Sequence, residues 1–222
     1  EIRLSLVGSE MCIRDSIAVE QFDNAGQVCL KGARLLVDAK IAEEFTQRVL
    51  DKARTLKQGD PRDLTSDVSA LITRKHFETV DGFVQRAKAD GARVLMGGGP
   101  NDELGGLFYS PTILADCPAG SEILTEEVFG PVLTIETFDG DEAGVAMAND
   151  TRFGLAATLV TSDPERAERV SAQLRAGTVW VNCFFVRDLG APFGGSGRSG
   201  IGREGGIWSF DFYCDVKNSV FA

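Results

Sequence analysis

One cysteine of this chain has the surroundings of a nucleophile. Cys29 ends a polar turn, residues 22–28 (FDNAGQV), and an apolar segment, residues 33–37, follows it. A thiol at the mouth of a loop, with backbone N–H groups converging nearby, can attack a carbonyl carbon. The alternative is a packing residue, since free cysteines are commonly buried. The spacing alone leaves both readings open.

A carboxylate and an aromatic ring form a second candidate. Glu127 and Phe129 lie just before the glycine and proline that open an apolar run. The family resemblance described below implies that the carboxylate accepts hydrogen bonds from two neighbouring hydroxyl groups and that the aromatic face restrains a planar ligand. Glu126 is better explained as a structural residue. The alternative for the stretch is a solvated turn with Phe129 anchored in the core.

A third group of residues could line a pocket. Phe185 and Phe193 are aromatic, and Arg187 lies between them in the sequence. A guanidinium at the mouth of an apolar pocket binds a carboxylate through two parallel N–H donors. The alternative is that Arg187 pairs with Asp188 or another surface acid. The family resemblance described below is what makes the pocket the favoured interpretation.

The glycine-rich stretch 195–200 matches the dinucleotide fingerprint G-x-G-x-x-G, but we reject that interpretation. The fingerprint has to follow a buried strand directly and open a helix. Here an irregular stretch, residues 188–193, precedes the glycines.

Composition narrows the function classes. The chain has 222 residues, a net charge of −10 and a pI of about 4.7, so we expect neither nucleic acid nor a membrane as a partner. No apolar run is long enough to cross a bilayer. The five cysteines are scattered and form no metal-ligand spacing, so we expect no metal and a cytoplasmic location.

Apolar periodicity predicts alternating strands and helices. Helices are expected over residues 42–56, 73–90, 142–148 and 164–176, and extended segments over 35–37, 93–96, 109–114, 131–138, 155–160, 178–181 and 212–217. Strands separated by helices imply parallel crossovers. We therefore predict an α/β fold with a mostly parallel sheet and helices on both faces.

The three motifs occur in an order that resembles one family. F-x-N-x-G-Q-x-C, E-x-F-G-P and P-F-G-G…S-G-x-G-R-E-x-G are similar to motifs of the NAD(P)-dependent aldehyde dehydrogenases. The resemblance implies an aldehyde-dehydrogenase-like catalytic domain over residues 18–222. It further implies that residues 212–217 form an oligomerisation strand, which makes the full-length parent a homodimer or homotetramer.

The resemblance also implies a role for each candidate residue. Cys29 is the expected catalytic nucleophile, and Glu127 and Phe129 are expected to hold the nicotinamide end of NAD, with NADP left open as the alternative. Substrate-binding roles fall to Phe185, Arg187 and Phe193.

Three stretches together, VRDL at 186–189, GIGREGG at 200–206 and FDFY at 210–213, are similar to semialdehyde dehydrogenases of aromatic ring cleavage. Those enzymes act on 2-hydroxymuconate-type and 5-carboxymethyl-2-hydroxymuconate-type semialdehydes. We therefore expect a small carboxylate-bearing aldehyde as the substrate. It would be oxidised to the acid through a thiohemiacetal and a thioester on Cys29.

The first residues depart from the family pattern. Residues 1–17 lack the Glu-Leu-Gly-Gly segment that carries the family's general base, and we interpret them as a non-native leader. Without that base and the cofactor domain, we expect these 222 residues alone to be inactive. Two other classes stay open: a non-catalytic oligomerisation or interaction fragment, and a cofactor-independent cysteine acyl transferase or thioesterase.

Overall fold

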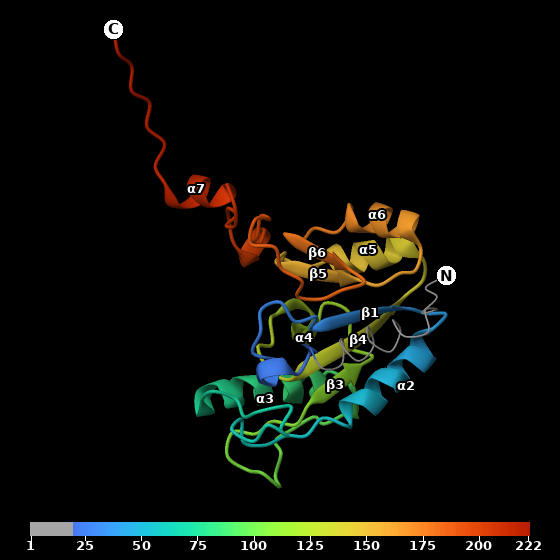
Figure 1. Ribbon diagram of the computed structural model, residues 1–222. Coiled ribbons are helices and arrows are strands. Elements are labelled where there is room, and N and C mark those ends of the chain that lie inside the picture. Colours follow the sequence, from blue (N-terminus) through green and yellow to red (C-terminus); the bar gives the residue numbers. More distant parts are fainter. Residues whose placement is uncertain (1–19) are drawn as a thin grey trace.

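The computed structural model describes residues 20–222 (Figure 1). The proposed leader, residues 1–17, lies outside the described residues. Within the described part, strands and helices alternate along the chain, as the periodicity predicted.

The strands form two sheets. The first sheet has the order β1-β4-β3-β2, and the second pairs β5 with β6. Their bounds are β1 Arg34–Asp38, β2 Arg93–Met96, β3 Thr112–Ala115, β4 Val132–Phe138, β5 Ala156–Leu159 and β6 Thr178–Val181. All pairs are parallel except β2 with β3. The predicted mostly parallel arrangement is therefore confirmed, although the described strands fall into two sheets rather than one.

Helices flank these sheets. Their bounds are α2 Ala42–Ala53, α3 Arg74–Ala89, α4 Glu122–Thr125, α5 Asp141–Asn149, α6 Pro164–Ser171 and α7 Trp208–Tyr213, with short 3-10 turns η1 Asp23–Gly26 and η2 Gly197–Ser199. In Figure 1, α2 and α3 lie on one side of the four-stranded sheet, and α5 and α6 lie beside β5 and β6. No described helix is long and apolar enough to span a bilayer.

The core lies where α2 and α3 cover the four-stranded sheet. Val49 of α2, Val84 of α3 and Leu133 of β4 have no exposed surface. Strand β3 is buried along its whole length because it lies between two other strands and beneath helices. Phe22 and Ala25 of the turn before Cys29 belong to this core.

Helix ends follow the expected capping chemistry. The Asp163 carboxylate accepts hydrogen bonds from the main-chain N–H groups of Glu165 (3.0 Å) and Arg166 (3.1 Å), and Pro164 is the first residue of α6. The sequence therefore predicted this boundary correctly. Thr73 caps α3 in the same way through the N–H of His76 (3.1 Å).

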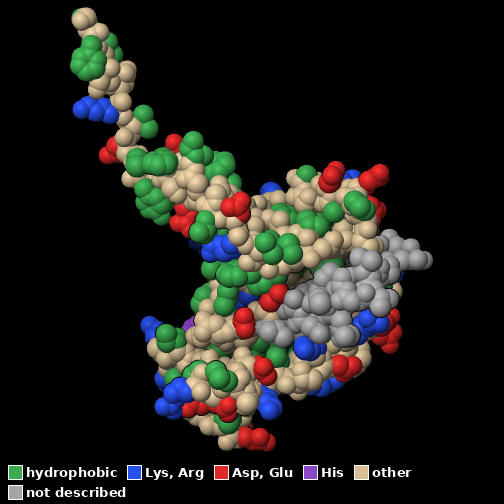
Figure 2. All heavy atoms as spheres, viewed as in Figure 1, with side chains coloured by type: hydrophobic (Ala, Val, Ile, Leu, Met, Phe, Trp, Pro, Cys, Tyr) green, Lys and Arg blue, Asp and Glu red, His purple; other side chains and the backbone are tan. Residues whose placement is uncertain are grey.

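The C-terminal segment differs from the prediction. The extended segment expected over residues 212–217 is helical at Phe212 and Tyr213, because α7 continues to Tyr213. An extended strand needs a neighbouring edge to pair with, and no described strand supplies one here. Hydrophobic side chains gather on this projecting segment (Figure 2). Exposed ones include Ile207, Phe210 and Phe221.

Candidate active site

The turn before Cys29 is tightly wound. Asn24, Ala25 and Gly26 all have positive φ, and the side-chain amides of Asn24 and Gln27 each donate to the other residue's carbonyl (3.1 and 3.0 Å). Such backbone is costly for residues other than glycine and persists where surrounding contacts enforce it. The turn leaves the Cys29 side chain exposed and free of any disulfide.

The turn packs against the stretch that contains Glu127 and Phe129. A Cβ atom on Gly26 would overlap the carbonyl oxygen of Gly130, and φ at Gly26 is +68°. Only glycine allows this approach without strain. Two motifs about a hundred residues apart in the sequence are thereby held in contact.

Lys31 strengthens this contact and was missed at the sequence level. Its side chain is buried, and its Nζ donates hydrogen bonds to the carbonyl oxygens of Gly130 (2.5 Å) and Val132 (3.0 Å). Burial lowers the pKa of Lys31 to about 7, against the opposing attraction of Glu127. A lysine two positions after the candidate nucleophile, beside the apolar segment, was the available signal.

The two acids of the second motif have different surroundings. Glu127 is exposed, whereas Glu126 forms an ion pair with Arg152. The main chain of Phe129 is held by His76, whose Nε2 lies 2.5 Å from the Phe129 carbonyl oxygen. Because a carbonyl only accepts, this nitrogen carries the proton. His76 is thus engaged with the acidic motif.

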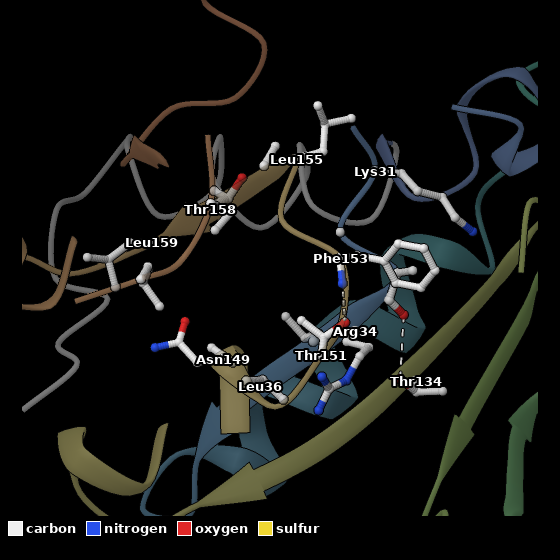
Figure 3. Close-up of a pocket in the computed structure, with 18 of the residues that line it drawn as sticks. Lys31, Arg34, Leu36, Thr134, Asn149, Thr151, Phe153, Leu155, Thr158 and Leu159 are labelled. Carbon is white, nitrogen blue, oxygen red and sulfur yellow. Dashed lines mark hydrogen bonds between the residues drawn. The ribbon is translucent and has the colours of Figure 1, made fainter. Parts of the chain in front are cut away.

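A cavity of about 630 Å³ connects Cys29 with Glu127. Figure 3 shows part of its lining, with Lys31 at one end and Thr158 and Leu159 of β5 at the other. Much of this lining is apolar. The structure therefore brings the candidate thiol and the candidate ribose-binding carboxylate to one cavity.

The candidate substrate residues form a separate cluster after β6. The Arg187 guanidinium carbon lies 4.6 Å from the centre of the Phe193 ring. The Asp188 carboxylate accepts from the N–H of Gly190 (2.8 Å). Phe185 is half-exposed and has φ of +54°. Arg187 is exposed, so its donors are available to a ligand.

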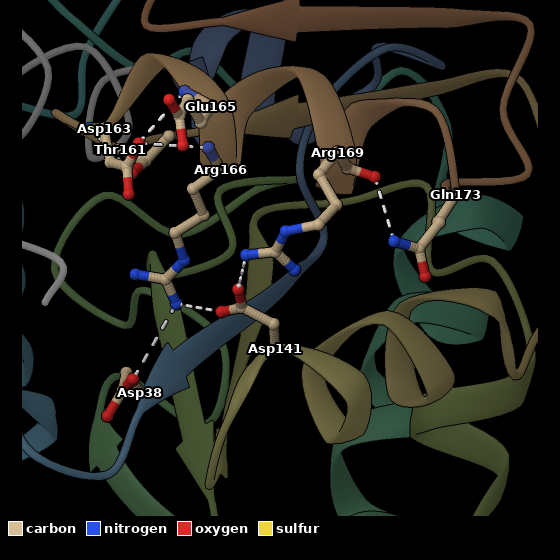
Figure 4. Close-up of polar contacts among 8 residues, drawn as sticks. All are labelled: Asp38, Asp141, Thr161, Asp163, Glu165, Arg166, Arg169 and Gln173. Atoms are coloured by element: carbon tan, nitrogen blue, oxygen red, sulfur yellow. Dashed lines mark hydrogen bonds and ion pairs between the residues drawn. The ribbon is translucent and has the colours of Figure 1, made fainter.

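A polar network occupies another part of the cavity wall. In Figure 4, Arg166 and Arg169 of α6 both point toward Asp141 of α5, and Asp38 at the end of β1 lies 4.0 Å from Arg166. Desolvation opposes ionisation of Asp141, but hydrogen bonds from Arg169 and Arg166 outweigh it and hold the pKa of Asp141 below its ordinary value. The network ties the second sheet's helices to the first sheet.

Comparison with known proteins gives the class. The aldehyde dehydrogenase family model matches residues 13–219. The chain belongs to the aldehyde dehydrogenase family.

Two curated relatives of this chain are semialdehyde dehydrogenases. The chain is 45% identical over 201 residues to 2-hydroxymuconic semialdehyde dehydrogenase of Pseudomonas sp. (strain CF600), covering 89% of this chain and 41% of that protein. It is 40% identical over 215 residues to 2-aminomuconic semialdehyde dehydrogenase of Danio rerio, covering 94% of this chain and 44% of that protein. The chain therefore spans less than half the length of these curated relatives.

Solved structures agree on the fold. Indole-3-acetaldehyde dehydrogenase complexed with NAD+ superimposes with a TM-score of 0.87 at 40% identity, over 92% of this chain and 41% of that one. HpcC from Thermus thermophilus superimposes with a TM-score of 0.88 at 38% identity, over 95% of this chain and 42% of that one. The predicted family and fold class are confirmed.

Proposed function

We propose that a full-length protein carrying this chain oxidises a carboxylate-bearing semialdehyde to the acid, with Cys29 as nucleophile and NAD as cofactor. The observation that supports it most is the shared cavity, which an exposed thiol and an exposed carboxylate both line. NADP stays the alternative cofactor.

The chain's own residues supply the covalent steps. The Cys29 thiolate forms a C–S bond to the aldehyde carbon, and the carbonyl oxygen becomes an oxyanion that the Cys29 N–H can stabilise. NAD, when bound, accepts the hydride that leaves this carbon, so the oxyanion collapses to a thioester. Water then attacks the thioester, the C–S bond breaks, and the acid and the thiol are released. We expect the base for this water to come from a part of the protein outside this chain.

The residues present fit the nicotinamide end of the cofactor. Glu127 offers two acceptor oxygens at the cavity, and His76 fixes the main chain of Phe129 beside it. Glu127 would hold the nicotinamide ribose, and Phe129 would pack beside the nicotinamide ring.

Replacing Glu127 by Gln tests the cofactor assignment. One acceptor oxygen becomes a donor, so aldehyde-dependent NADH formation should show a KM for NAD raised about tenfold, with little change in melting temperature. Glu126→Gln is the control, because Glu126 is paired with Arg152 and should leave the KM for NAD unchanged. Ester turnover without NAD, and no NADH formation, would favour an acyl transferase or thioesterase instead.

Arg187→Met tests the substrate class. Loss of the guanidinium should raise the KM for 2-hydroxymuconic semialdehyde about 10- to 100-fold, because a charge-assisted pair is lost. An aliphatic aldehyde without a carboxylate should be oxidised as before. Arg62→Met is the control, since Arg62 is exposed and pairs with Asp60 on a surface turn. An equal loss for both aldehydes would contradict the assignment.

Assembly and location belong to the same proposal. The exposed apolar side chains after residue 206 support a homodimer or homotetramer formed through the C-terminal segment. The four described cysteines are free, which suits a reducing cytoplasm.

A further inference from the structure

Lys31 is buried to an extent that is rare for lysine. Only 9% of the residue is exposed, whereas Cys29, two positions earlier, is exposed. Lysine is almost never fully buried unless its ammonium has partners. A buried lysine two positions from the proposed nucleophile therefore needs a structural explanation.

The partners of Lys31 are main-chain carbonyls from a distant segment. Nζ donates to Gly130 and Val132, which follow Glu127 by three and five positions. Both the ammonium and the neutral amine carry at least two N–H donors, so these two bonds survive deprotonation. Lys31 therefore joins the loop that carries Cys29 (residues 22–31, the thiol loop) to the loop that carries Glu127 (residues 126–130, the acidic loop) in either protonation state.

The same segment is approached from a second direction. Gly26, on the other side of Cys29, packs against the Gly130–Pro131 peptide. Residues before and after the thiol thus both touch one peptide, so the acidic loop cannot shift without moving the thiol.

We propose that Lys31 is a positioning residue that ties the Cys29 loop to the Glu127 loop and so fixes the thiol relative to the nicotinamide cofactor. This inference rests on the proposed function for its catalytic consequence, but the tie itself does not. Lys31 lies on the cavity wall, but its Nζ is engaged by the carbonyl oxygens of Gly130 and Val132, so its proposed role acts through the two loops.

The test is Lys31→Met in a full-length protein that carries this chain. Methionine fills similar space without donors. We expect kcat for aldehyde oxidation to fall at least about tenfold, because a misplacement of about 1 Å can cost a hundredfold, while the KM for the aldehyde stays within about threefold. Amide hydrogen exchange should become faster in residues 22–29 and in residues 126–130 together.

Two controls separate positioning from loss of stability. Val84→Ala removes core volume in α3 and leaves both Lys31 hydrogen bonds intact, so it should lower the melting temperature with kcat retained. Lys40→Met removes an exposed lysine and should change nothing. Should Lys31→Met not fold, Lys31→Gln is measured in the same way, since its shorter amide cannot reach both carbonyls.

Each result is decisive. Unchanged exchange in both loops, or a kcat within about twofold of the starting protein, overturns the proposal, as does a loss in kcat matched by Val84→Ala. If the starting protein forms no NADH at all, the proposed function fails. Faster exchange in both loops would then still establish the tie.

Discussion

Replacing Cys29 by Ala in a full-length protein should lower aldehyde-dependent NADH formation at least about a thousandfold, because Cys29 is the one cysteine among residues 20–222 that lines the cavity. The side chain is exposed at the cavity that Glu127 also lines, so alanine removes chemistry without disturbing packing. Binding of NAD, followed by fluorescence quenching, should be retained. Rapid mixing should also show no acyl-enzyme in the variant.

The matched control for this experiment is Cys214→Ala. Cys214 is likewise exposed and free, but it follows α7 in the C-terminal segment. Its replacement should leave kcat unchanged. A Cys29→Ala variant with the activity of the Cys214→Ala variant would remove the nucleophile from the mechanism and favour the interaction-fragment alternative.

Gly26→Ala should be the most destabilising single-methyl change in the turn. Left-handed backbone costs a residue with a Cβ about 1–2 kcal/mol. The added methyl would also overlap the Gly130 carbonyl, which is backbone and cannot rotate away. We expect a loss of about 3 kcal/mol or more in the free energy of unfolding, measured by chemical denaturation, since overpacking adds about 1–3 kcal/mol.

Gly105→Ala separates the two contributions. Gly105 has a similar φ of +64°, but nothing lies within 4 Å of its added Cβ. It should therefore show only the backbone cost, about 1–2 kcal/mol. Equal losses in the two variants would mean that the contact between the cysteine turn and Gly130 is not tight. In that case both loops could move independently.

The sequence predicted most elements because their side chains repeat at regular intervals. Residues 93–96 and 178–181 were predicted as strands with the bounds the structure gives, and α3 was placed within one residue at each end. The division into two sheets was not predictable, because strand pairing depends on contacts between distant segments. The helix at Phe212 and Tyr213 was missed because aromatic residues favour strands, whereas no described strand is there to pair with them.

The structure bears on each candidate site residue in a different way. Cys29 and Glu127 were found from their motifs, and the structure places both at one cavity. Lys31 was overlooked because burial of a charged side chain contradicts its ordinary preference. The stacking of Arg187 on Phe193 could not be read from spacing, since neither residue lies in a regular element. The roles themselves stay predictions until the variants are measured.

The proposed nucleophile and the proposed substrate-binding arginine lie next to different sheets. Cys29 precedes β1 in the four-stranded sheet, whereas Arg187 follows β6 in the two-stranded one. Under the proposed roles, reactivity and selectivity are therefore carried by segments next to different sheets. Exchange of residues 182–193 between relatives offers a route to new aldehyde preferences, because the loops that hold the nucleophile stay untouched.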